Sequence, residues 1–379
     1  MGLPLFLCGF ISAAVTIAAA VFSFLDGEFR TGPYVDVERV EASIPHAETR
    51  YYYQSLDRRM KSDFCALYDA LENFEEVCDL PYTLSREEFE ILQYLLMYDC
   101  PELLQYDKDH AVTADLTANK RYRSIHLNYL MDKAEYEEAL SACQAVVKET
   151  AESAEGLDEW EKEKLAYDFV TNGTSYVLEG NATIGNAAGV LLYREAKCDG
   201  ISLALKWLCE EMGLPSYILA GENERFEVGH VWNVIEIEGA YYDVDATGDA
   251  AREEADHNLY GAYNVSKNWS RYQYQVRENL TAYFSLPGTE NMDRSYYVQG
   301  HAYLRWDYDN KAVFFENLEK CLSEGENIFF LQVAGKSVLK DFREELDDYM
   351  AEWNETHGSD LHVTSQVCTK YNLIRMKVF

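Results

Sequence analysis

One cysteine in this sequence stands where a thiol could act as a nucleophile. Cys198 lies in the polar turn Lys197-Cys198-Asp199-Gly200, which is followed by an apolar run with nearly helical spacing. The apolar residues of that run are Leu203, Leu205, Trp207 and Leu208. The pattern predicts a helix with Cys198 at its N-terminus. Unpaired backbone N–H groups and the helix dipole favour negative charge there, so they would stabilise a thiolate and later an oxyanion.

A predicted β-hairpin supplies the partners that a nucleophilic thiol needs. Residues 229 to 245 alternate with period two around Glu238-Gly239, which is typical of a tight turn. A two-residue loop makes Ile237 face Ala240, and His230 and Asp245 then share a face as diagonal neighbours, about 7–8 Å apart at the backbone. A three-residue loop would put them on opposite faces. In the first register the imidazole can take the thiol proton while the carboxylate fixes its tautomer.

The ordered set of motifs resembles the transglutaminase-like cysteine enzymes of bacteria, over roughly Ala134 to Leu286. The resemblance rests on Gly189-Val190-Leu191, Lys197-Cys198-Asp199-Gly200, Cys209 through Gly213-Leu214-Pro215, His230-Val231-Trp232-Asn233-Val234, Gly239 through Tyr242, Asp243-Val244-Asp245-Ala246-Thr247, and Tyr263-Asn264-Val265-Ser266. It implies a papain-like α+β core with Cys198, His230 and Asp245 as the catalytic triad. The family usually carries a Trp where this chain has Gly248, a difference that would alter the wall of the cleft.

Three further side chains are candidates for the cleft. In the expected register Trp232 shares the face of His230 and Asp245, where it would either shield their ion pair from water or pack as an ordinary core aromatic. A second oxyanion donor should come from upstream of the nucleophile, and Asn186 and Tyr193 are the candidates for it.

We expect no metal and no cofactor. The histidines show no HExxH or other ligand spacing. Residues 243 to 254 come within one substitution of a calcium-loop pattern, but such a loop requires a preceding helix, whereas the preceding residues alternate with period two. Calcium would also compete for Asp245, so the calcium and triad interpretations largely exclude each other. Cys209, on nearly the same helix face as Cys198, is predicted to be a buried core thiol rather than a second nucleophile.

The charge balance argues against a nucleic-acid partner. Acidic residues outnumber basic ones 66 to 33, giving a net charge of −33, and no cluster of Lys and Arg appears. Such acidity is typical of a solvated surface, with an attraction for basic substrates as the alternative.

The first segment differs in kind from the rest. Residues 3 to 25 carry no charged side chain. This charge-free run is long enough to cross a bilayer core of about 30 Å as a helix. We therefore predict that residues 1–27 are a signal peptide or a membrane anchor and that the remainder is extracytoplasmic, either secreted or anchored.

Three further regions are expected in an α+β protein. Residues 28–130 form a mainly helical N-terminal region, which begins with a linker to about residue 45. Residues 131–286 form the transglutaminase-like catalytic domain, and residues 287–379 a small C-terminal α+β domain. The expected helices cover 51–74, a segment capped by Ser85 and Glu88, and segments beginning at Asp132, Asp158, 312 and 337; the expected strands cover 124–131, 328–333 and 371–379.

These patterns predict a cysteine-dependent amide-bond enzyme. Cys198 would attack a carboxamide, form a thioester and pass the acyl group to water or to an amine, and the resemblance implies peptide or protein substrates. Hydrolysis is favoured, because water is the default acceptor when no lysine-binding feature can be named. The alternatives are a non-catalytic cell-surface binding module on the same scaffold and a calcium-dependent structural domain. The sequence does not determine the oligomeric state.

Overall fold

The structure is a computed structural model, and it describes most of the chain beyond residue 28. The described residues are 29–108, 113–223, 228–250, 258, 260–267, 274–290, 293–299, 303–306, 311–323, 328–333, 339–368 and 373–378. Segment 1–27, for which a signal peptide or anchor is predicted, lies outside them. Within the described ranges no helix is long and apolar enough to span a bilayer.

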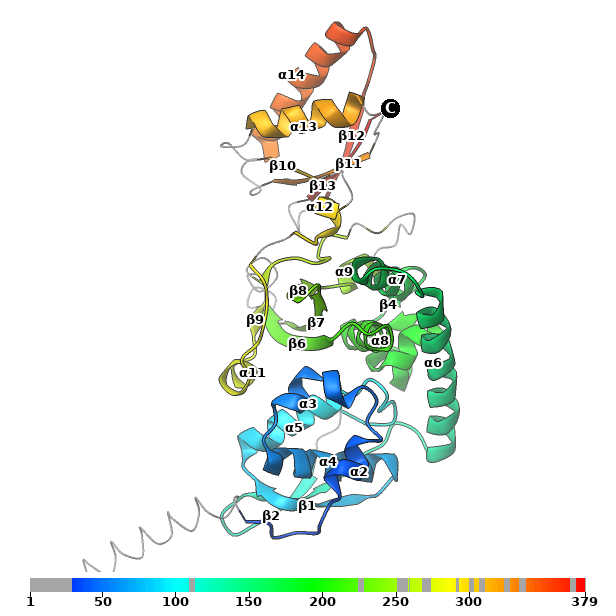
Figure 1. The fold of residues 1–379 in the computed structure, drawn as a ribbon, viewed down its shortest axis with the longest axis vertical. Helices are drawn as coiled ribbons and strands as arrows, with labels where there is room; N and C mark the ends of the chain where they lie inside the picture. Colours follow the sequence, from blue (N-terminus) through cyan, green and yellow to red (C-terminus); the bar gives the residue numbers. More distant parts are fainter. Residues whose placement is uncertain are drawn as a thin grey trace, which may run out of the picture.

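The described chain is a mixed α+β protein whose parts follow one another along its long axis (Figure 1). The N-terminal part, at the bottom of Figure 1, combines helices with a three-stranded antiparallel sheet in the order β1-β3-β2. Its helices are α2 (Val37–Glu41), α3 (Tyr51–Ser55), α4 (Arg58–Glu72) and α5 (Arg86–Tyr98), and its strands are β1 (Val77–Leu84), β2 (Thr113–Leu116) and β3 (Tyr122–His126). Ser85 and Glu88 form the expected capping box at the start of α5.

Several expectations for this part were wrong in detail. Residues 37–41 are not linker, because Asp36 caps α2 and Val40 is fully buried. The helix expected over 51–74 is interrupted, since Asp57 is extended and its side chain accepts from the Met60 N–H to start a new helix. Strands β1 and β2 were not predicted. The strand expected over 124–131 is β3, which ends at His126.

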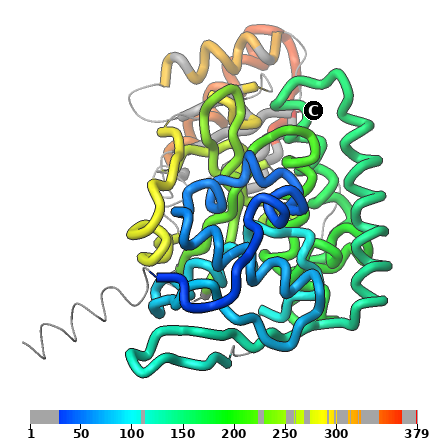
Figure 2. Tube along the Cα trace, turned by 60° about the horizontal axis from the view of Figure 1, so that its bottom comes forward, coloured from blue at the N-terminus to red at the C-terminus, as the bar shows by residue number. Residues whose placement is uncertain are grey.

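The central part places three long helices beside a four-stranded antiparallel sheet in the order β8-β7-β6-β9. The helices are α6 (Lys133–Ser153), α7 (Glu159–Thr171) and α8 (Cys198–Glu211), and the strands are β6 (Ser216–Asn223), β7 (Val228–Ile237), β8 (Ala240–Val244) and β9 (Gln275–Val276). Capping boxes at Asp132 and Asp158 start α6 and α7 as expected. Helix α8 packs on β6 and β7, while α6 runs along one side of the molecule (Figures 1 and 2).

Short elements complete the central part. The two-residue strands β4 (Ser175–Tyr176) and β5 (Glu195–Ala196) pair in parallel. Between them lie the 3-10 turn η2 (Ala182–Gly185) and the single π-helical segment η3 (Gly189–Tyr193). The short helices α9 (Thr247–Ala250) and α11 (Glu278–Tyr283) follow β8 and β9.

The described C-terminal part is a four-stranded sheet with three helices, and its strand order is β10-β11-β13-β12. It contains α12 (Tyr296–Gln299), β10 (Tyr303–Trp306), α13 (Lys311–Ser323), β11 (Ile328–Val333), α14 (Leu339–His357), β12 (Val363–Cys368) and β13 (Leu373–Val378). The expected helices and strands correspond to α13, β11, α14 and β13, whereas β10 and β12 were not predicted.

The hydrophobic core is continuous between the N-terminal and central parts. Buried side chains from Val40 to Phe284 belong to one cluster, while those of α13, α14 and β13 form a second cluster. The hydroxyls of Tyr52 in α3 and Tyr94 in α5 both donate to the backbone carbonyl of Ile218 in β6, at 2.7 Å each. The predicted boundary near residue 131 is therefore crossed by buried contacts, and it stays a prediction as a domain limit.

Candidate active site

Cys198 is the first residue of α8. Lys197 precedes it in extended conformation, and the Lys197 side chain makes no capping hydrogen bond at this helix start. The N–H groups of the first turn therefore stay available to a negative group beside the thiol. Cys198 is also partly exposed, whereas the other described free cysteines, Cys65, Cys78, Cys100, Cys143 and Cys209, are buried. The expectation that Cys209 is a core thiol is confirmed, and its burial raises its pKa well above the usual range.

Gly200 fixes the start of α8 against the preceding loop. A Cβ at this position would lie 2.6 Å from the carbonyl oxygen of Ile184 and 2.8 Å from that of Asn186. Both neighbours are backbone atoms, which cannot turn aside as a flexible side chain can. The glycine two positions after Cys198 thus allows the helix to approach the loop closely and sets the position of the nucleophile.

The hairpin that follows has the register expected for a two-residue loop. Ile237 pairs with Ala240 across β7 and β8, and the two loop residues Glu238 and Gly239 have φ values of 51° and 79°. Positive φ at both loop residues is the signature of a type I′ turn. The imidazole Nε2 of His230 consequently lies 2.9 Å from the carboxylate of Asp245.

The surroundings of His230 favour its charged form. Burial alone would lower its pKa, but the charge and hydrogen bond of Asp245, together with the hydrogen bond and charge of Cys198, raise it to about 9. Because Nε2 bonds to Asp245, Nδ1 is the ring nitrogen left to face the thiol. Asp245 is oriented in turn by the backbone N–H of Thr247, which donates to its other oxygen at 3.1 Å. The arrangement can therefore hold a thiolate–imidazolium pair.

A second carboxylate beside the thiol was not predicted. Asp199 lies 3.8 Å from the Cys198 sulfur, and the Lys108 ammonium donates to it at 2.8 Å. Burial alone would raise the pKa of Asp199, but the charges of Lys108 and Lys197 hold it below its usual range. This negative charge beside the thiol is thus balanced by a lysine of the N-terminal part.

Aromatic rings surround the imidazole. Trp232, on the expected face, lies nearly parallel to His230 at a centroid distance of 6.2 Å, and its indole N–H donates to Asp243 at 2.9 Å. Tyr274, which sequence reasoning missed, lies on the same imidazole at 4.6 Å. Tyr176 of β4 was also missed; burial, followed by the charges of Cys198, Asp199 and Asp245, raises its pKa to about 12. Its hydroxyl therefore stays protonated at neutral pH and can donate a hydrogen bond.

The other sequence candidates are placed differently. The Asn186 amide donates to the Leu104 carbonyl at 2.9 Å and accepts from the Ala188 N–H at 3.0 Å. Its hydrogen bonds therefore hold the loop before α8 in place. Tyr193 is 51% exposed at the end of η3. In the described chain neither side chain hydrogen-bonds to Cys198 or His230. No local pattern in the sequence indicated that Tyr176, rather than Asn186 or Tyr193, belongs to this site.

The described residues include no cluster of three or more His, Cys, Asp or Glu that could hold a metal ion. Two carboxylates of the segment that resembles a calcium loop already accept hydrogen bonds from other side chains. Asp243 accepts one from Trp232, and Asp245 accepts one from His230. Residues 251–257, including Glu254, lie outside the description.

Comparison with known proteins adds distant likenesses only. No family model matches the chain. No curated protein matches it either. Among solved structures, a TGase crystal structure matches 39% of this chain and 46% of its own, at 16% identity and a TM-score of 0.27. The periplasmic domain of TgpA from Pseudomonas aeruginosa, bound to ethylmercury, matches over 41% of this chain and 72% of its own, at 17% identity and a TM-score of 0.24.

The matched region spans less than half of the TGase chain. Each of these TM-scores is below 0.5. The TGase structure is nonetheless of the kind that the sequence resembles.

Proposed function

We propose that this chain is a cysteine-dependent amide-bond enzyme on a papain-like transglutaminase core. Cys198 is the nucleophile, His230 the general base and acid, and Asp245 the residue that orients the imidazole. The observation that carries this proposal is the 2.9 Å bond between His230 and Asp245 beside a partly exposed thiol at an uncapped helix start.

The reaction begins with proton transfer from the Cys198 sulfur to His230. The thiolate attacks the carbonyl carbon of an amide, so that a C–S bond forms and the carbonyl π electrons move to oxygen. N–H groups of the first turn of α8 stabilise this oxyanion. Collapse of the adduct breaks the C–N bond, His230 gives its proton to the leaving amine, and a thioester remains. His230 then deprotonates the acceptor, which attacks the thioester and releases the thiol.

We assign the second oxyanion donor to Tyr176 rather than to Asn186 or Tyr193. The support is electrostatic: the Tyr176 phenol is close enough to Cys198 for the thiolate charge to raise its pKa. Strand β4, which carries Tyr176, pairs with β5, and β5 ends two residues before the nucleophile. The Asn186 amide, in contrast, already donates to Leu104.

The substrates proposed are peptide or protein amides, with water as the favoured acceptor. Residues 131–286 are proposed as the catalytic domain, with residues 28–130 and 287–379 on either side. The separate hydrophobic cluster of α13, α14 and β13 supports residues 287–379 as a domain of their own. The charge-free run of residues 3–25 is the sole support for a signal peptide or anchor and for an extracytoplasmic location.

The test is the pH dependence of Cys198 alkylation in wild type and His230→Ala, read by peptide mass spectrometry. Buried thiols such as Cys143 and Cys209 provide an internal control in the same protein. We expect wild-type Cys198 to react at about pH 6, far below the ordinary thiol pKa of about 8.5, and the variant to react at least about tenfold more slowly. Equal, slow reaction in both proteins would contradict the triad and favour a non-catalytic binding module.

A further inference from the structure

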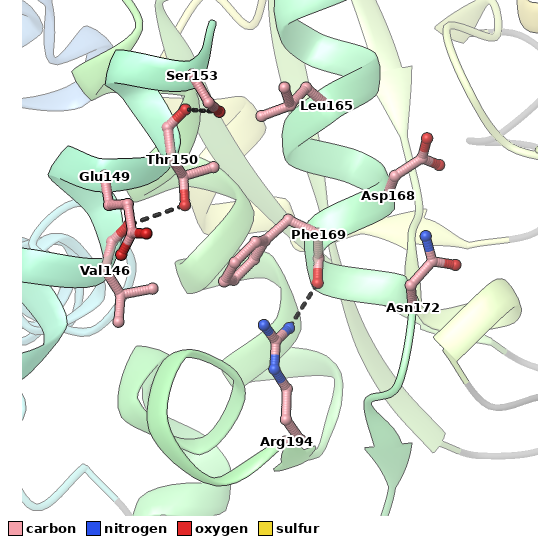
Figure 3. Close-up of a pocket in the computed structure, with 9 residues that line it drawn as sticks. All are labelled: Val146, Glu149, Thr150, Ser153, Leu165, Asp168, Phe169, Asn172 and Arg194. Atoms are coloured by element: carbon pink, nitrogen blue, oxygen red, sulfur yellow. Dashed lines mark hydrogen bonds between the residues drawn. The ribbon is translucent and has the colours of Figure 1, made fainter.

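A cavity of about 540 Å³ lies between α6 and α7, outside the proposed active site (Figure 3). Val146 and Glu149 of α6, Leu165 and Phe169 of α7, and Arg194 after η3 are among the residues that line it. Its volume lies in the range of pockets that bind small molecules, about 300–1,000 Å³. No residue of the triad contributes to its wall.

Arg194 is the cation of this cavity. Its Nη1 donates to the Phe169 carbonyl at 2.7 Å, and its guanidinium lies over the Phe169 ring at 4.1 Å from the centroid. Among the described residues no carboxylate pairs with it. Burial therefore lowers the pKa of Arg194 without a compensating charge. In a chain with twice as many acidic as basic residues, an arginine held in place without an acidic partner indicates an anion site.

The backbone of Arg194 is in a left-handed conformation, as are those of six other described residues that are not glycine. Its φ of 57° lies in the left-handed region, which is uncommon for a residue other than glycine. Here the left-handed turn ends η3 and directs the chain into β5.

The two acidic residues of the cavity do not cancel this cation. Asp168 accepts hydrogen bonds from Lys164, Tyr260 and Asn258, so its charge is already matched. Glu149 is exposed at the edge of the cavity, where solvent screens its charge. Val146, Leu165 and Phe169 contribute apolar surface to the wall, which also includes Thr150, Ser153 and Asn172. The cavity thus offers one positive group together with an apolar surface.

We propose that this cavity binds the carboxylate end of an apolar amino acid, free or at the C-terminus of a peptide. The free edge of the Arg194 guanidinium receives the carboxylate, and the apolar side chain packs on Phe169, Leu165 and Val146. The free amino group of an amino-acid ligand would lie near the Glu149 carboxylate and interact with its charge. The acylated nitrogen of a peptide C-terminus is neutral and would make no such interaction.

The cavity is linked to the nucleophile through β4 and β5. Asn172 lines the cavity three residues before β4, and Arg194 directly precedes β5. The Ser175 N–H donates to the Arg194 carbonyl at 2.8 Å, so the two segments are joined at the edge of the cavity. The residue whose side chain would hold the ligand therefore directly precedes the strand that leads to Cys198.

The test is calorimetric titration of the whole chain with phenylalanine, N-acetylphenylalanine and phenylalaninamide. We expect one or both carboxylates to bind and the amide to bind at least about tenfold more weakly, since it lacks the charged acceptor. Arg194→Gln should lose the carboxylate binding, whereas Arg194→Lys should retain part of it, because it keeps the charge without the planar fork. Tighter binding of phenylalanine identifies a free amino acid, and tighter binding of the acetylated probe a peptide C-terminus.

Lys148→Gln is the matched control, because it removes one positive charge from the exposed side of α6. It should bind the carboxylates as wild type does, and circular dichroism should show that every variant is folded. The proposal is overturned if no carboxylate binds at about 10 mM, a concentration well above the Kd of even weak specific sites. It is also overturned if phenylalaninamide binds as tightly as the carboxylates, or if folded Arg194→Gln binds them as wild type does. Each of these results is independent of Cys198 and of the proposed catalysis.

Discussion

The carboxylate of Asp245 lies 2.9 Å from Nε2 of His230, although β8 ends one residue before Asp245. The bond determines which imidazole nitrogen faces the thiol, and it places a negative charge behind the ring when the ring becomes positive. The chemistry of the proposed site depends on this contact, and two predictions follow from it.

Asp245→Asn should slow the alkylation of Cys198 at about pH 6 by at least tenfold, because the amide no longer stabilises the imidazolium that accompanies the thiolate. Asp243→Asn is the matched control. It changes a neighbouring buried carboxylate that accepts from Trp232 but is not bonded to His230. If the two variants react at the same rate, Asp245 has no special role in the triad.

The contribution of the His230–Asp245 pair to stability should fall as pH rises. The pKa of His230 is raised to about 9 from an ordinary value near 6.5, so the proton is bound more tightly in the folded protein. The resulting stabilisation is complete below about pH 6.5 and disappears as pH passes through about 9. Urea unfolding at several pH values should therefore show that Asp245→Asn costs more stability at about pH 6 than at about pH 10. A cost independent of pH would contradict this coupling.

Gly200→Ala should disturb the nucleophile helix. The added Cβ meets two backbone carbonyls at 2.6 and 2.8 Å, so the start of α8 must shift. We expect a loss of about 1–3 kcal/mol in the free energy of unfolding, together with slower Cys198 alkylation. Gly229→Ala in β7 is the control, because its Cβ would meet no atom within 4 Å. Equal stability of the two variants would show that the loop adjusts freely.

Lys206 is a buried cation whose removal should be costly. Its side chain is fully buried and bonds to Glu210, to Asp99 at 3.2 Å and to the Ser216 carbonyl at 2.7 Å. Lys206→Ala would leave two buried carboxylates without their cation, so we expect a loss of about 3–5 kcal/mol on urea unfolding. Lys148→Ala, which breaks an exposed pair with Glu152, should cost under about 1 kcal/mol. Comparable costs for the two variants would rule out a buried ion cluster.

Local signals in the sequence were sufficient to predict the main parts of the site. Glu238-Gly239 specifies a two-residue turn, which determines the register of β7 and β8 and hence which residues share the face of His230. The capping residues Ser85, Asp132 and Asp158 likewise start their helices where expected, because a cap acts within a single turn.

The features that were missed depend on contacts between distant segments. Lys108 and Asp199 are separated by 91 positions, and no local pattern shows that they meet. Tyr176 and Tyr274 lie in or beside two-residue strands, which are too short to give a periodic signal. Strand β1 contains Pro81 and a register irregularity, so its alternation is broken.

The continuous core bears on how the proposed activity could be switched on. Many hydrolases are made as zymogens and become active when a leading segment is cut away and leaves. Here Tyr52 and Tyr94 bond to Ile218 in the central sheet, and Lys108 balances the carboxylate beside the nucleophile. Departure of the N-terminal part would expose apolar surface and leave Asp199 without that lysine. If the proposed activity is controlled, we therefore expect control through access to the site or supply of substrate, and not through proteolytic removal of the N-terminal part.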